Sequence, residues 1–398
     1  MKRVLILGTV FPESNSSAAG RKMLQWISLF QQQKWLIHYA STSPLNDFSD
    51  DLSKLEVETQ QVEVNAASFD LFLQEIQPEI VLYDRFMVEE QFSWRIREAF
   101  PNCVHLLETQ DLHFLRWARQ KDESIYNQLT KRELAAILRC DLSFIISRKE
   151  ITLLQEKFPF VAPQIEYFPL CYSPDFSAIE NLSDRRDFFF IGNFHHAPNV
   201  DAVLFLKKIW KQIHTELKTV NCHIYGAYPT QQILELQQKN DGFFVHGHLA
   251  EAKTAFLRHR VLLAPLKFGA GLKGKLLESM QFGGISLTTE IGAEGISEKP
   301  FWNGKIVSQD EFATAAIQLY LDREKDEIYQ KNGFKILQEN FDLSIFNALI
   351  INKINNILLN IEQWRNERFL TEIVNFHRIQ SVRYLSKWIN EKQNVNKK

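Results

Sequence analysis

Short apolar runs alternate with helical patterns along most of the 398-residue chain, and this alternation restricts the fold more than any other feature. Such runs, bounded by turn residues and separated by amphipathic stretches, are typical of parallel strands covered by helices on both faces. The first series of predicted strands covers residues 4–7, 36–40, 80–84, 104–107, 142–146 and 165–168, with helices predicted at 19–32 and 125–138. The second series covers residues 188–191, 222–225, 243–246, 261–266 and 285–288. We therefore predict an α/β fold with two doubly wound domains.

The length also favours two domains, because single cores rarely grow beyond about 250–300 residues. Between Pro169 and Arg186 the chain is rich in Pro, Ser, Asp and Asn and lacks periodicity, as expected of a linker. The pattern beyond Asp310 is wholly helical. We place the first domain at residues 1–172, the linker at 173–186, the second domain at 187–345 and C-terminal helices with a basic tail at 346–398.

The charge totals demand no polyanionic partner, because 46 Lys and Arg are balanced by 48 Asp and Glu. The C-terminal tail is locally basic, with Arg378, Arg383, Lys387, Lys392, Lys397 and Lys398 against the single acid Glu391. An apolar stripe of Ile379, Val382, Leu385 and Ile389 would lie beside this basic face. We favour a terminal helix that packs back on the body, and peripheral contact with an anionic membrane surface or with nucleic acid stays open.

Nothing in the sequence indicates a membrane-spanning protein, because no apolar run reaches the roughly 18–20 residues that a bilayer requires. The N-terminal run from Val4 to Phe11 resembles a short secretory signal, but a buried strand that ends at Gly8 is the better interpretation. The four cysteines are widely spaced and are expected to be reduced thiols. We expect a cytoplasmic protein.

The most informative segment is a glycine-rich loop between a predicted strand and a predicted helix, with Gly269, Gly271 and Gly274. Backbone N–H groups converge at such a helix start, and glycines let an anionic ligand approach closely. Lys273 and Lys275 add positive charge to the loop. The segment therefore predicts a phosphate-binding site, and a simple tight turn is the alternative.

Two well-known phosphate motifs overlap with this loop, and both fit imperfectly. The glycines satisfy the dinucleotide pattern GxGxxG, but the loop follows the fourth strand of its series, whereas that pattern belongs to the first strand–helix turn of a domain. Leu276 replaces the Ser or Thr that a P-loop needs for magnesium. Glu278 lies about one turn into the helix, where a carboxylate can accept from both hydroxyls of a ribose, unless it is a plain surface residue.

This segment resembles the retaining glycosyltransferases of GT-B fold, specifically the family 4 group. The resemblance covers roughly residues 188–296 and includes Gly192-Asn193 and Tyr225-Gly226, and the first half of the chain is similar through looser features. It implies two Rossmann-like domains that face each other across a cleft. It further implies a hexosyltransferase-like, metal-independent enzyme that takes a nucleoside-diphosphate sugar and needs no other cofactor. The sugar would pass to an acceptor hydroxyl with retention at the anomeric carbon.

The resemblance also assigns expected roles to particular residues. Lys273 and Lys275 would neutralise the leaving diphosphate, His113 would touch the transferred sugar, and Asp111 is the rival candidate for that contact. The expected donor-binding residues are Gly20, Arg21, Gly192, Asn193, Tyr225, Gly226, Gly269, Gly271, Gly274 and Glu278.

The chain departs from the family pattern at two places. Ala270 stands where the family usually has the first of two glutamates, and Asn193 and Pro198 stand roughly where many relatives have Arg and Lys. These departures keep open a catalytically silent scaffold of the same fold, beside the alternative of a dinucleotide-dependent Rossmann enzyme. The acceptor is open among a glycan, a lipid-linked glycan, a protein and an RNA.

The histidine pairs do not predict a metal site. His195-His196 and His246 with His248 lack a nearby third ligand in the sequence. Asp84 and Arg85 end a predicted strand near the expected cleft, where acceptor contacts could arise.

Overall fold

The computed structural model describes residues 1–176, 182–297 and 301–396, and it confirms the α/β fold with two parallel sheets. The sheet of the first domain has strand order β3-β2-β1-β4-β5-β6-β7, and all its neighbouring strands are parallel. Its strands are β1 (Arg3–Gly8), β2 (Leu36–Ser41), β3 (Glu58–Gln61), β4 (Ile80–Asp84), β5 (Val104–Glu108), β6 (Leu142–Ile145) and β7 (Ile165–Tyr167).

The sheet of the second domain has strand order β10-β9-β8-β11-β12-β13 and is also parallel. Its strands are β8 (Arg186–Ile191), β9 (Cys222–Tyr225), β10 (Phe243–Gly247), β11 (His259–Ala264), β12 (Ile285–Thr288) and β13 (Gly304–Ile306).

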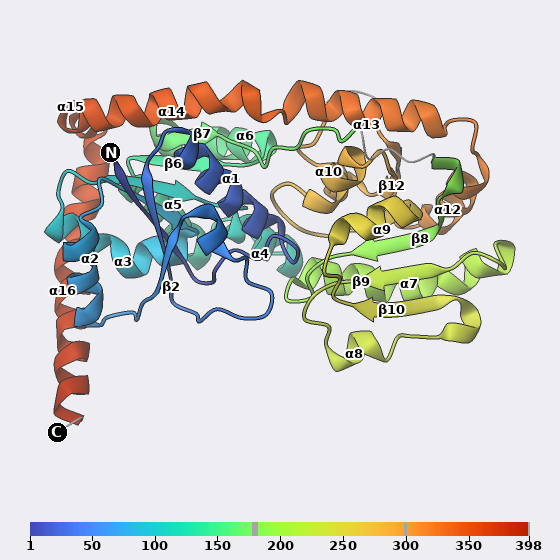
Figure 1. Ribbon diagram of the computed structural model, residues 1–398, viewed down its shortest axis with the longest axis horizontal. Helices are drawn as coiled ribbons and strands as arrows, with labels where there is room; N and C mark the ends of the chain where they lie inside the picture. The colour runs from blue at the N-terminus through green and yellow to red at the C-terminus, as the bar shows by residue number, and fades with distance from the viewer. Residues whose placement is uncertain (177–181, 298–300, 397–398) are drawn as a thin grey trace.

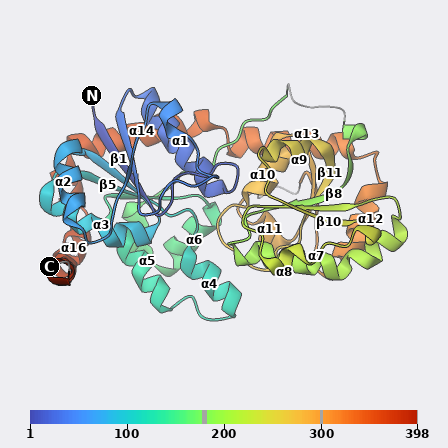
Figure 2. The same ribbon diagram turned by 60° about the horizontal axis from the view of Figure 1, so that its bottom comes forward.

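Helices cover both faces of each sheet (Figure 2). Those of the first domain are α1 (Ala18–Gln32), α2 (Ala67–Ile76), α3 (Phe86–Ala99), α4 (His113–Lys121), α5 (Gln128–Arg139) and α6 (Arg148–Lys157), with 3₁₀ turns η1 (Leu52–Leu55) and η2 (Pro159–Gln164). The second series is η3 (Leu182–Asp184), α7 (Ala197–Glu216), α8 (Gln231–Leu234), η4 (Lys239–Asp241), α9 (Ala252–Arg258), α10 (Gly274–Gln281), α11 (Glu290–Ala293), α12 (Phe312–Leu321) and α13 (Asp326–Asn340). The chain ends with α14 (Leu343–Leu359), α15 (Ile361–Asn366) and α16 (Phe369–Asn396).

The continuous apolar character of the central strands follows from this two-sided burial. On β1, Val4 and Ile6 pack in the core beneath α1, whereas Leu5 and Leu7 pack in the core on the opposite face. Successive side chains of a strand point to opposite faces, so a strand covered on both sides is apolar at every position. The N-terminal apolar run is therefore an interior strand of the first sheet.

Helix α14 crosses from the second domain back to the first, along the top of the molecule in Figure 1. Its Ile350, Ile354 and Ile357 are fully buried in the core that lies beneath α1. The other crossing is the linker after β7, and the Tyr172 N–H donates to the Phe341 carbonyl just before α14 at 2.9 Å. The two crossings therefore lie next to each other.

The strand orders place a ligand cleft between the domains. Strand order reverses between β1 and β4 in the first sheet and between β8 and β11 in the second. Ligands of open α/β sheets bind beyond the carboxyl ends of the strands at such switch points. The arrows of β8, β9 and β10 point toward the first domain (Figure 1), so the loops that follow β8 and β11 face it.

All the predicted strands are present, and two additional strands were missed. β3 is a fully exposed polar edge strand, and β13 has three residues that are exposed or half-buried. Neither has the apolar pattern by which buried strands are recognised. Residues 177–181 of the predicted linker lie outside the described residues.

The C-terminal tail is partly as predicted. Thr371 and Asn375 at the start of α16 are buried against the first domain, but α16 then extends away from the body (Figure 1). Leu385 of the predicted apolar stripe is 56% exposed, so packing on the body is wrong at that position. The side chains of Arg378, Ile379, Val382, Arg383, Lys397 and Lys398 lie outside the described residues. None of the described helices is both long and apolar enough to cross a bilayer.

The crossing helix provides a test of what joins the domains. Ile354→Ala removes a fully buried side chain of α14 and should lower the free energy of unfolding by about 2–5 kcal/mol. The matched control is Ile345→Ala in the same helix, where the side chain is 48% exposed and the loss should be about 0.5 kcal/mol or less. Denaturant unfolding measures both, and equal losses would contradict the packing described.

Candidate active site

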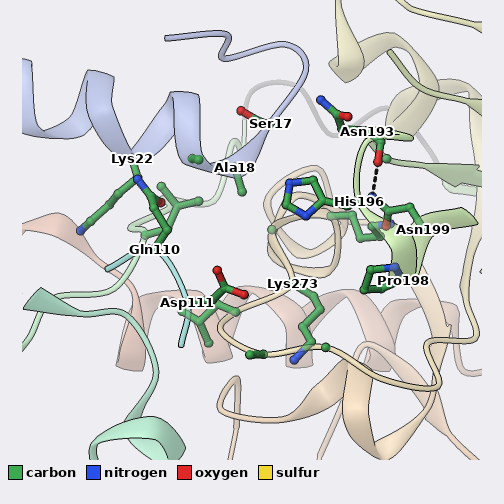
Figure 3. Close-up of a pocket in the computed structure, with 18 of the residues that line it drawn as sticks. Ser17, Ala18, Lys22, Gln110, Asp111, Asn193, His196, Pro198, Asn199 and Lys273 are labelled. Atoms are coloured by element: carbon green, nitrogen blue, oxygen red, sulfur yellow. Dashed lines mark hydrogen bonds between the residues drawn. The ribbon is translucent and has the colours of Figure 1, made fainter. Parts of the chain in front are cut away.

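A cavity of about 380 Å³ lies between the domains, beyond the carboxyl ends of both sheets. Figure 3 shows side chains of the first domain, among them Asp111, facing side chains of the second, among them His196 and Lys273. Six cationic side chains line it, against two carboxylates in the described part of the chain: Arg21, Lys22, Arg85, Arg116, Lys273 and Lys275, with Asp111 and Glu278. The excess of positive charge suits an anionic ligand.

Helix N-termini add to this positive potential. α1 and α10 begin at residues that line the cavity, as do His196 and Pro198 on either side of the first residue of α7, and no side chain caps α7 or α10. The N-terminus of a helix carries a partial positive charge and attracts phosphate groups. α4 also begins at the cavity, but its first amides donate to the buried Glu133 carboxylate at 3.1 and 3.0 Å, so they are already occupied.

Lys275, in the first turn of α10, is a half-buried cation of the second-domain wall. Its ammonium donates to Asn199 Oδ1 at 2.7 Å and lies 3.9 Å from the centre of the Phe190 ring. Burial lowers its pKa to about 7, although the charge of Glu278 opposes that shift. An anion bound beside it would restore the proton and stabilise the charge.

Lys273 precedes the helix and is more deeply buried. Its ammonium donates to the Gly271 carbonyl at 2.9 Å, so the side chain folds back along the glycine loop. Burial lowers its pKa to about 8, against the opposing charges of Glu294 and Glu150. Both lysines thus have depressed pKa values, as expected of cations held in a site where no counterion fully compensates them.

Glu278 is held by the first domain and the linker. Its Oε1 accepts from Arg21 in an ion pair and from the Tyr172 hydroxyl at 3.4 Å. Burial would lower the pKa of Arg21, but Glu278 outweighs it and the guanidinium pKa is raised. Within the described residues Oε2 has no hydrogen-bond partner, and the side chain lines the cavity, so one carboxylate oxygen is available to a ligand.

Asp111 and His113 form the opposite wall. Asp111 is ion-paired with Arg116, and His113 Nε2 lies 3.4 Å from Asp111 Oδ1 without making a hydrogen bond to any described residue. Burial alone would raise the pKa of Asp111, but Arg116 foremost and His113 outweigh it, so the pKa is lowered. Burial lowers the pKa of His113 to about 4. At neutral pH the site therefore presents a carboxylate beside a neutral imidazole that has an unused ring nitrogen.

The glycine loop is bound by the first domain rather than left open to a ligand. Arg119 donates to the Gly269 carbonyl at 2.7 Å and is paired with Glu294 at 2.8 Å. The Gly271 amide donates to Glu150 Oε1 at 2.8 Å. Burial, and the nearby Asp111, raise the pKa of Glu150 to about 7, against the amides that donate to it. The Gly271 amide is thus not free for a phosphate, and this part of the predicted cradle is used for domain contact.

The structure places ten of the fourteen predicted site residues at the cavity: Arg21, Asp111, His113, Gly192, Asn193, Gly269, Lys273, Gly274, Lys275 and Glu278. The other four, Gly20, Gly271, Tyr225 and Gly226, do not line it. The Tyr225 hydroxyl lies 2.9 Å from His259 Nε2 on the sheet, and the Gly226 amide donates to the Gly247 carbonyl. Gly20 lies behind the cavity wall, with its amide bonded to Ser17.

Arg85 follows β4 and lines the cavity, as predicted for the strand end at Asp84-Arg85. Two other lining residues, Arg116 one turn into α4 and His196 just before α7, were missed as cleft residues because their sequence contexts carry no motif. Lys22 bonds the carbonyls of Phe168 and Pro169, both at 2.9 Å, and so anchors the start of the linker.

Comparison with known proteins agrees with this fold. Residues 185–322 match the model of the family described as Glycosyl transferases group 1. No curated protein matches the chain by sequence.

Solved structures show the fold over nearly the whole chain. A sucrose-phosphate synthase from Thermosynechococcus elongatus has a TM-score of 0.71 at 14% identity, covering 91% of this chain and 100% of that one. The pneumococcal O-GlcNAc transferase GtfA, in complex with UDP and GlcNAc, has a TM-score of 0.68 at 12% identity, covering 90% and 99%. Anabaena HepE, in complex with UDP and glucose, has a TM-score of 0.64 at 13% identity, covering 89% and 100%.

The chain is therefore a two-domain α/β protein of the GT-B class. Its second domain carries the group 1 glycosyl transferase pattern, and the predicted resemblance to these glycosyltransferases is confirmed.

Gly271 tests the contact of the loop with the first domain. A Cβ at Gly271 would lie 2.8 Å from the Asp111 Cβ, and the backbone has φ +62°. Gly247 has a similar φ of +73°, but a Cβ there would meet no atom closer than 3.9 Å. Gly271→Ala should therefore lower the free energy of unfolding by about 1 kcal/mol or more beyond the loss in Gly247→Ala. Equal losses in denaturant unfolding would mean that the loop is not packed on the first domain.

Proposed function

We propose that the protein is a retaining glycosyltransferase that takes its sugar from a nucleoside diphosphate. The observation that supports this most is the pair of lysines at the start of α10, the buried Lys273 and the half-buried Lys275, one turn before the free oxygen of Glu278. Lysines with depressed pKa values at an uncapped helix N-terminus form a site for a diphosphate, and a carboxylate one turn further suits a ribose.

The donor is proposed to lie along the second-domain wall. Lys275 and the N-terminus of α10 would contact the diphosphate, and Glu278 Oε2 would accept from the ribose hydroxyls. The GtfA and HepE structures are complexes with UDP, so UDP and its sugars are the first probes to use. The transferred sugar would then lie near Asp111 and His113. The free Nε2 of His113 can form a hydrogen bond with a sugar hydroxyl.

The proposed chemistry needs charge stabilisation more than a nucleophile. The bond between the anomeric carbon and the phosphate oxygen breaks with its electron pair going to the diphosphate. The acceptor oxygen then bonds to the same face of that carbon, and the acceptor proton passes to the departing phosphate oxygen. Ammonium groups and a helix N-terminus placed where this negative charge grows lower the barrier, and so we propose a metal-independent transfer.

Ala270 lines the cavity where the family usually has its first glutamate. The sugar contacts of that acid would therefore come from first-domain residues, among which Asp111 and His113 are the nearest in role. This departure also favours the second candidate, a silent scaffold that binds a donor without transferring it. The acceptor class, and contact of the basic tail with an anionic surface, stay predictions.

Lys275 should be required for transfer. Lys275→Ala removes the ammonium beside the leaving diphosphate and should lower the turnover of UDP-glucose, as transfer or as slow hydrolysis, by about 100-fold or more. The matched control is Lys267→Ala on the same loop, where the side chain is exposed and turnover should change less than about twofold. Turnover that is absent from the wild type as well, while UDP binds, would favour the silent scaffold.

Glu278 should recognise the ribose. In calorimetric titrations the wild type should bind UDP about tenfold tighter than 2′-deoxy-UDP, because a bond to a carboxylate is lost. Glu278→Gln should bind UDP more weakly and lose most of this preference. Glu290→Gln, an exposed glutamate at the start of α11, should keep it. A preference unchanged in Glu278→Gln would remove the ribose contact.

Donor affinity should fall as pH rises. Lys275 has a pKa of about 7 and Lys273 of about 8 without ligand, and a bound diphosphate raises both, so binding takes up protons. From about pH 6.5 to 8.5 the affinity for UDP-glucose, whose diphosphate does not titrate there, should fall about tenfold. Lys275→Met should flatten the profile to the part contributed by Lys273. A wild-type affinity independent of pH would contradict the depressed lysine pKa values.

A further inference from the structure

A cluster of imidazoles and one carboxylate lies at the opposite end of the second sheet from the cleft. Asp187 is the second residue of β8, His223 the second of β9 and His259 the first of β11, so all three lie at the amino ends of adjacent strands. Figure 1 shows β8, β9 and β10 side by side, with these ends directed away from the first domain. The proposed transfer reaction uses none of these residues.

The three side chains converge on one point. One ligand atom from each of Asp187, His223 and His259 lies within 4.8 Å of the other two. His223 Nε2 and Asp187 Oδ2 form a hydrogen bond of 3.3 Å, whose place a metal ion would take. Two ligands on a tetrahedral zinc ion, with bonds of about 2.1 Å, are separated by about 3.4 Å. This pair already has the spacing of metal ligands.

Each candidate ligand is held from behind by its other polar atom. His223 Nδ1 lies 2.8 Å from His246 Nε2, and His259 Nε2 lies 2.9 Å from the Tyr225 hydroxyl. Asp187 Oδ1 accepts from the Asn221 amide at 2.8 Å. Outer partners of this kind fix the orientation and tautomer of metal-binding histidines.

His259 supplies the observation that points to a ligand. Its ring is 1% exposed, and Nδ1 makes no hydrogen bond of normal geometry to any residue that the structure describes. Buried polar atoms are nearly always bonded, so an orphan aimed at a carboxylate and a second imidazole needs a partner.

We propose that Asp187, His223 and His259 form a zinc site, with His246 and Tyr225 as outer partners and water completing the coordination. Two histidines and a carboxylate are ligands that Zn²⁺ accepts, and the exposed His246 and the partly exposed Asp187 leave a path for the ion. The ion would join three adjacent strands at the end of the sheet remote from the donor, and so would stabilise the second domain rather than take part in transfer. The prediction of no metal site considered only histidines that are neighbours in the sequence, whereas these three ligands are 36 residues apart at each step, 187 to 223 and 223 to 259.

Metal content and affinity test the proposal on the full chain. After removal of metal with a chelator, the wild type should bind one Zn²⁺ per chain, as measured by mass spectrometry and calorimetry. Its melting temperature should be about a few degrees higher with Zn²⁺ than without it. Asp187→Asn and His259→Gln should each weaken Zn²⁺ binding on the order of 100-fold or more, and His246→Gln by about tenfold. His38→Gln, which removes an imidazole from β2 of the first domain, should bind Zn²⁺ as the wild type does.

Cobalt spectroscopy keeps the test independent of whether the variants fold. Co²⁺ added to the wild type should give the visible absorption bands of a four-coordinate site, and Zn²⁺ should displace them. Absence of these bands, or Zn²⁺ affinity equal in the wild type and in His259→Gln, would overturn the zinc site. Turnover of UDP-glucose should be the same before and after metal removal, so loss of turnover would instead contradict the metal-independent transfer proposed above.

Discussion

The contact between the glycine loop and the first domain is the constraint on which the rest of the site depends. Arg119 and Glu150 bind the loop at Gly269 and Gly271, on either side of Ala270. The loop leads directly into α10, so its fixed position determines the backbone positions of Lys273, Lys275 and Glu278. The glycines therefore serve the approach of one domain to the other as much as the approach of a ligand. Fold and site are linked here by backbone geometry rather than by any catalytic side chain.

Electrostatics explains why this closed arrangement needs an anion. The cavity gathers six cationic side chains and the uncapped starts of α7 and α10, with Asp111 and Glu278 as the carboxylates among its described lining residues. Asp111 and Glu278 are each paired with an arginine. Burial lowers the pKa values of both loop lysines by more than the nearby carboxylates, Glu278 for Lys275 and Glu294 and Glu150 for Lys273, raise them. A bound diphosphate would therefore interact favourably with the ammonium groups of both lysines.

The sequence predicted the fold well because the central strands are buried on both faces and are apolar at every position. It missed β3 and β13, whose stability comes from pairing at a sheet edge rather than from burial. At the site, Lys273, Lys275 and Glu278 were found because they are neighbours in a motif. Arg85 was expected near the cleft because it follows a predicted strand, whereas Arg116 and His196 were missed because only the tertiary fold brings the starts of α4 and α7 together. The prediction that Tyr225 binds the donor failed for a simpler reason, since the Tyr225 side chain is directed toward His259 and away from the cleft.

The bond between Tyr172 and Phe341 has a mechanical consequence. The chain passes between the domains twice, and these two passages are tied to each other at one place. Domains connected at two distant points cannot rotate without stretching one connection. Domains whose connections lie side by side can rotate about that place. The two chain crossings therefore act as a single hinge, about which the domains can open while the hinge itself keeps its alignment.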